Sequence, residues 1–213
     1  MALLHRAELH PTKLELLSLW LPQRPWYRGP AVPELSRVAA FRFDDPAGEV
    51  GIETLLVRAD DGPLLQAPLT YRAAPVDGLE PWLLGAAEHS VLGTRWIYDG
   101  CADPVYAGAL AGTIVTGDGQ AEEFLDVDGE LQRREPSMRV SGSGSAAAPS
   151  VDALDGVVDE DPTVIVADSV ELAVLRVLGD NDSDDGRSGL TLTGIWDGQS
   201  TPRLLARAAL RAG

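Results

Sequence analysis

The fold is decided by the stretch between residues 36 and 73, which contains three strand-like runs separated by two turns. In order, the pieces are SRVAAFRF (36–43), DPAG (45–48), EVGIETLLVRA (49–59), DDG (60–62) and LLQAPLTYRA (64–73). Aspartate, proline and glycine are typical of tight hairpin turns, and the runs between them alternate apolar with polar residues. This pattern predicts an antiparallel meander with one face on the core.

The segments on either side predict further strands and two helices. Strands are expected over 2–8, 81–91, 94–98, 124–126 and 131–140. Leucines at helical spacing after Pro11 predict a helix over 11–21. Asp103 and Pro104 form a typical N-cap and first helical residue, which predicts a second helix over 104–116. Residues 1–140 are therefore expected to form an α+β domain, a curved and mainly antiparallel sheet with two packing helices.

Residues 141–162 have the composition of a flexible linker, because SGSGSAAAP (141–149) is followed by an acidic stretch. No packed element is expected there. The tail, residues 163–213, predicts four β-like runs, at 163–167, 170–178, 190–196 and 203–208. About fifty residues are few for an independent core, so this β-rich extension is expected to dock on the first domain. The acidic run 179–189 is predicted to be a solvated loop, since it lacks the glycine and glutamate of a calcium-binding loop.

Charge and composition exclude several classes of protein. The 213 residues include 33 acidic and 17 basic ones, for a net charge of −16. This balance argues against a nucleic-acid partner. No window approaches the roughly 18 to 20 apolar residues of a membrane helix, and the N-terminus lacks the apolar stretch of a signal peptide. One cysteine, Cys101, cannot form an internal disulfide. We therefore expect a cytoplasmic chain without a membrane partner.

Counts of two residue types argue against phosphoryl transfer. Lys13 is the only lysine, and no glycine-rich loop precedes it; Asn181 is the only asparagine, with no histidine near it. A P-loop needs a lysine after its glycines, and a kinase site needs a lysine, an aspartate and an asparagine in fixed roles. No cofactor is therefore expected. The three histidines lack metal-ligand spacing, so no metal site is expected either.

Five residues are candidates for a functional surface or pocket. His89, Asp99 and Cys101 could assemble a nucleophilic site, although a structural role for His89 is the favoured interpretation because no oxyanion-hole signature accompanies them. Trp26 and Tyr27 lie in a proline-bounded loop that could offer an exposed aromatic surface to a partner. No catalytic residue is assigned among them.

Several segments taken together resemble the N-terminal cap domain of actinobacterial maltokinases. They are ALLHRA (2–7), PTKLELL (11–17), WLP (20–22), EHSVLG (88–93), RWIYD (95–99), DPVY (103–106) and LTLTGIW (190–196). The resemblance implies a curved antiparallel sheet with helices, similar to the cystatin fold, and a setting in trehalose and glycogen metabolism. In maltokinases this cap precedes a catalytic lobe, whose phosphate-binding and magnesium-binding motifs cannot be placed on this chain.

Two hypotheses follow from these observations. The favoured one is a non-catalytic accessory or protein-interaction module, whose partner is an enzyme of α-glucan metabolism. The alternative is a sugar or sugar-phosphate enzyme, or an ATP-binding kinase-related protein, with a site of unfamiliar type. The sequence does not specify the oligomeric state.

Overall fold

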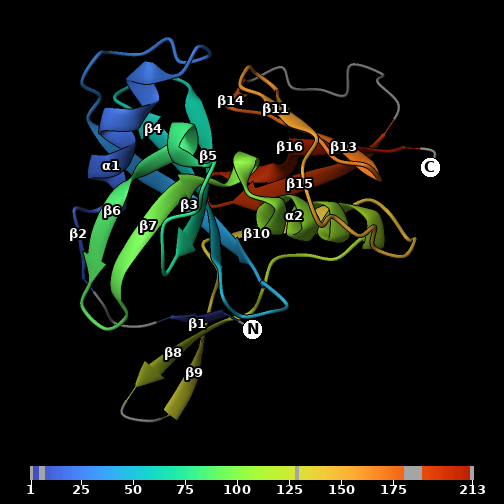
Figure 1. Cartoon of the computed structure of the whole chain (residues 1–213), viewed down its shortest axis with the longest axis horizontal. Coiled ribbons are helices and arrows are strands. Elements are labelled where there is room, and N and C mark those ends of the chain that lie inside the picture. Colours follow the sequence, from blue (N-terminus) through green and yellow to red (C-terminus); the bar gives the residue numbers. More distant parts are fainter. Residues whose placement is uncertain (1, 5–7, 128–129, 180–188, 212–213) are drawn as a thin grey trace.

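The computed structural model describes residues 2–4, 8–127, 130–179 and 189–211, which form three β-sheets and two α-helices (Figure 1). Most strand pairs are antiparallel, which confirms the α+β class with a β-rich extension. The acidic run expected to form a loop falls largely on 180–188, outside the described residues. Neither helix within the described ranges has the length and apolar character needed to cross a bilayer.

The predicted meander lies in a seven-stranded sheet. Its order is β2-β6-β7-β5-β4-β3, and β14 pairs with β5 outside that path. The strands are β2 (Leu9–His10), β3 (Leu35–Phe43), β4 (Gly51–Ala59), β5 (Leu64–Arg72), β6 (Leu83–His89), β7 (Gly93–Asp99) and β14 (Val177–Leu178). Short 3-10 turns cover Leu21–Gln23, Glu80–Trp82 and Gly100–Ala102. Strands β3, β4 and β5 pair in sequence, as their turn residues predict.

Both faces of this sheet are covered by apolar side chains, so the face that the alternation of residues placed on the core is one of two buried faces. Strand β4 shows this directly: Leu55 and Val57 belong to the core beneath α1 (Lys13–Trp20), and Ile52 and Leu56 belong to a second core on the opposite face. The apolar side chains of the second core come from α2 and the tail as well as from the meander, which the local pattern of β4 does not reveal.

Helix α1 lies within the predicted range 11–21 and begins two residues later than predicted, at Lys13. Thr12 is its N-cap, and Thr12 and Glu15 form a reciprocal capping box that satisfies two backbone N–H groups. Leu17 and Trp20 are its buried anchors on the sheet.

The second core lies between the meander, α2 (Pro104–Thr116) and a six-stranded sheet of order β10-β15-β16-β13-β12-β11. Those strands are β10 (Met138–Gly142), β11 (Gly156–Val158), β12 (Thr163–Val166), β13 (Val170–Val174), β15 (Leu190–Trp196) and β16 (Gln199–Leu210). Helix α2 is capped by Asp103 and ends at Gly117, which has a φ of 82°. Its residues Tyr106 and Leu110 are buried in this core, so α2 packs on the six-stranded sheet as well as on the meander. The boundary between the first domain and the tail stays a prediction.

Residues 143–155, here called the strap, are packed along α2, so the expectation of no packed element across 141–162 was wrong (Figure 1). The last carbonyls of a helix lack partners within the helix. The strap supplies partners for two of these carbonyls, because the backbone N–H groups of Gly144 and Ala146 donate to the carbonyls of Ile114 and Val115 at 2.9 and 3.0 Å. The small residues that gave this segment the composition of a linker are the ones that allow the strap to approach α2 closely.

Gly144 tests this account of the strap. A Cβ atom there would lie 2.1 Å from the carbonyl oxygen of Val115, whereas a Cβ at Gly156 would meet nothing within 4 Å. We expect Gly144→Ala to cost about 1–3 kcal/mol of unfolding free energy and to lower the melting temperature by roughly 2–12 °C. Gly156→Ala is the matched control, and thermal unfolding followed by circular dichroism makes the comparison. Equal melting temperatures for the two variants would contradict the packed strap.

A third, three-stranded sheet extends away from the two larger ones (Figure 1). It contains β1 (Ala2–Leu4), β8 (Glu123–Val127) and β9 (Glu130–Arg134), and we call it the arm. The hairpin of β8 and β9 was predicted. Residues 138–142 were expected to continue the second strand of that hairpin, but they pair instead with β15, 50 to 58 residues further along the chain.

Candidate functional site

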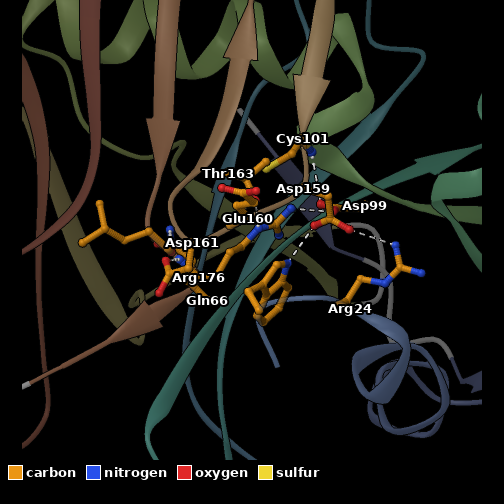
Figure 2. A network of polar contacts seen from close by, with 11 residues as sticks. Arg24, Gln66, Asp99, Cys101, Asp159, Glu160, Asp161, Thr163 and Arg176 are labelled. Carbon is orange, nitrogen blue, oxygen red and sulfur yellow. Dashed lines mark hydrogen bonds and ion pairs between the residues drawn. The ribbon is translucent and has the colours of Figure 1, made fainter. Parts of the chain in front are cut away.

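Three of the candidate residues, Trp26, Asp99 and Cys101, meet at the junction between the meander and the six-stranded sheet, around Arg176 (Figure 2). Arg176 follows β13 and is completely buried. Its Nη2 donates to Oδ2 of Asp99 at 2.5 Å, and its Nε donates to Oγ1 of Thr163 at 2.7 Å. Its guanidinium also lies 5.2 Å from the ring centroid of Trp26. A charge this deeply buried needs such partners, since its desolvation costs several kcal/mol.

Both carboxylate oxygens of Asp99 accept hydrogen bonds. While Oδ2 accepts from Arg176, Oδ1 accepts from the backbone N–H of Cys101 at 3.2 Å and so caps the short turn after β7. Burial by itself would lower the pKa of Arg176, but the Asp99 carboxylate beside it raises that pKa overall. Arg176 and Asp99 therefore form a fixed ion pair. Asp99 acts as a hydrogen-bond acceptor and does not orient a catalytic base.

Cys101 is fully buried and reduced. Burial, and after it the neighbouring carboxylates Asp99 and Asp159, raise the pKa of the Cys101 thiol well above its usual range, against the lowering effect of Arg176. Because the thiolate is the reactive form, this environment is that of an inert thiol.

His89 is not part of this group. It lies at the end of β6, where its Nδ1 accepts from the backbone N–H groups of Val91 and Leu92 at 3.3 and 3.0 Å. Its pairing partner is Gly93, at the opposite end of β7 from Asp99. At about 3.3 Å per residue, this separates His89 from Asp99 by about 20 Å along the strand. The structure therefore brings Asp99 and Cys101 together and places His89 in a turn.

Trp26 and Tyr27 are buried, so the prediction of an exposed aromatic docking loop was wrong. Trp26 packs edge-on against Trp20 of α1, and its Nε1 donates to Oδ1 of Asp159 at 2.7 Å. Nη1 of Arg24 donates to the other oxygen of Asp159 at 3.1 Å. The carboxylate at the far end of the 141–162 segment thus fastens the aromatic loop (Figure 2).

A second buried charge cluster joins α1 to the meander. Glu53 is buried, and Nζ of Lys13 and Nη2 of Arg42 lie 2.5 and 2.9 Å from its two oxygens, while the hydroxyl of Tyr71 donates to it at 2.7 Å. Burial would raise the pKa of Glu53, but Arg42 and Lys13 outweigh burial and lower it to about 2. The only lysine of the chain therefore has a structural partner.

Sequence reasoning missed the residues that organise both clusters. Arg176 and Glu53 each interrupt an apolar run, at 170–178 and 49–59, and a charge within a buried strand was the available signal. Asp159 and Thr163 carried no such signal, because acidic and hydroxyl residues are ordinary in the surrounding segment.

The chemistry of these clusters is that of ion pairing. The carboxylates of Asp99 and Glu53 are each saturated by cations and hydrogen-bond donors. Among the described residues, no group of three or more His, Cys, Asp and Glu side chains could hold a metal ion. Asp103, also buried, binds Arg72 through two hydrogen bonds of 2.8 and 2.7 Å while it caps α2.

Comparison with known proteins gives one family. Residues 20–103 match the model of the maltokinase N-terminal cap domain. These residues form a cap-like domain. The match begins at the last residue of α1, includes the aromatic loop and strands β3 to β7, and ends at the N-cap of α2. The cap-like domain therefore supplies Arg24, Trp26, Asp99 and Cys101 to the junction, and the remainder of the chain supplies Asp159 and Arg176. No curated protein matches the chain.

Proposed function

We propose that the chain is a non-catalytic accessory module that binds another protein, and that this partner is an enzyme of α-glucan metabolism. The observation that carries the proposal is that Asp99 is bound to Arg176 and to the backbone of Cys101, and Trp26 to Asp159, far from His89. The metabolic setting, trehalose and glycogen, rests on the kinase family that gives the cap-like domain its name.

The turn between β6 and β7 is the surface we assign to the partner. It exposes two adjacent apolar side chains, Val91 at 57% and Leu92 at 44%. His89 accepts from both of their backbone N–H groups, which fixes the turn that presents them. A fixed apolar pair costs little entropy to bury, which is what the centre of a protein interface requires.

Affinity purification of the intact chain from its native cells tests the partner. An α-glucan enzyme should be enriched with the wild type and lost with Val91→Asp combined with Leu92→Asp. Val32→Asp is the matched control, because Val32 is 82% exposed in a different loop. If no α-glucan enzyme is enriched, or the turn variant retains it, the proposal fails.

A thermal shift assay tests the non-catalytic role. A ligand at a hundred times its dissociation constant stabilises the native state by about 2.7 kcal/mol. For a chain of this size, that raises the melting temperature by roughly 5–11 °C. We expect no shift in melting temperature with Mg-ATP, maltose or both. A reproducible shift of that size would favour the ligand-binding alternative.

A further inference from the structure

The arm ends in an edge strand, β9, that no other described strand covers. All five of its residues are exposed. Other long edges are protected: Ser137 bonds both backbone groups of Ala40 on β3, and Gln120 accepts from the backbone of Val140 on β10. An open edge presents unpaired N–H and C=O groups, which can pair with another strand.

The sequence of β9 is complementary to itself. Glu130 and Arg134 lie four residues apart and so on the same face of the strand. If two copies of β9 pair antiparallel about a two-fold axis at Gln132, each Glu130 faces the Arg134 of the other copy. Shifting the axis to Arg133 would place two arginines opposite each other, and shifting it to Leu131 would lose both ion pairs. The charges therefore select one register.

We propose that the chain forms a symmetric dimer by antiparallel pairing of β9 with β9 of a second copy, centred on Gln132. The two three-stranded arms become one six-stranded sheet, which is within the usual range of sheet sizes. Leu131, 53% exposed in the single chain, lies across from the aliphatic part of Arg133 in this register. The isologous arrangement closes on itself, so growth stops at two copies.

The net charge of −16 on each copy opposes this association, so the dimer is expected only at high protein concentration and physiological salt. At that ionic strength charges more than about 8 Å apart are largely screened, and the directly opposed pairs of β9 are affected less.

Charge reversal with sedimentation velocity on the full chain tests the dimer. Glu130→Arg turns two attractive pairs into two repulsive ones and should weaken self-association at least about tenfold. Arg134→Glu has the same effect between copies, and it also removes the ion pair of 3.7 Å between Arg134 and Glu123 within each arm. An equal mixture of the two variants should associate again, because both pairs are restored between unlike copies. Glu34→Arg is the control. It makes the same change of charge at an exposed site just before β3, outside the arm, and should self-associate like the wild type.

Disulfide cross-linking tests the register even where a charge variant disturbs the arm. Residues directly opposed in an antiparallel pair lie about 4.5–5.5 Å apart at Cα, within reach of a disulfide. Oxidised Gln132→Cys should form a covalent dimer, whereas Ser200→Cys, exposed in another sheet, should not, and the buried Cys101 leaves no background. A monomer at all concentrations, self-association unchanged by Glu130→Arg, or no preference for cross-linking at position 132 would each overturn the proposal.

Discussion

Replacing Arg176 with methionine is expected to destabilise the chain by about 3–5 kcal/mol, the usual cost of removing one partner of a buried ion pair. The variant leaves the buried carboxylate of Asp99 without its cation and removes the contact with the Trp26 ring. For a chain of this size, the melting temperature should fall by roughly 6–20 °C. Thermal unfolding monitored by circular dichroism would measure this change.

Two further variants distinguish the loss of stability caused by breaking the ion pair from the loss caused by replacing a large side chain. Asp99→Asn combined with Arg176→Met removes both charges and retains the acceptor for the backbone of Cys101, so it should recover much of the loss. Arg139→Met removes an arginine whose ion pair with Glu135 is exposed, and it should change stability little. If Arg176→Met is as stable as Arg139→Met, the junction does not depend on this pair.

Glu53→Gln is expected to lower the free energy of unfolding by about 3 kcal/mol at neutral pH. Lys13 and Arg42, against the effect of burial, lower the pKa of Glu53 from 4.5 to about 2, and each pKa unit corresponds to about 1.4 kcal/mol. The neutral amide cannot balance the two cations, so the attachment of α1 to β4 should weaken as well.

The pH dependence of this effect has a definite sign. Because the pKa of Glu53 is lower in the folded state than in the unfolded one, its stabilisation is complete above about pH 4.5 and is lost as the pH falls toward 2. Urea unfolding at several pH values should therefore show the difference between wild type and Glu53→Gln narrowing on acidification. Glu49→Gln, an exposed carboxylate in the preceding turn, is the control. A difference that stays constant down to pH 3 would count against the ionised cluster.

The elements that the sequence predicted are those fixed by local chemistry. Asp103, Pro104 and Gly117 place α2 within a residue, because capping and left-handed conformations depend on a few adjacent side chains. The turns at 45–48 and 60–62 place β3, β4 and β5 for the same reason. Asp99 and Cys101 were recognised as neighbours because they are close in the chain.

Tertiary structure decided what composition could not. The glycines at 142 and 144 fit a flexible linker and a close helix contact equally well, and only the position of α2 distinguishes the two. Trp26 and Tyr27 are buried because they pack in the core beneath α1, and the indole of Trp26 bonds to Asp159, more than 130 residues away. Asp99 meets Arg176 across 77 residues. The sequence by itself determined the local elements through short-range hydrogen bonds and backbone preferences, whereas the pairing of distant charges depended on which layers the apolar surfaces brought together.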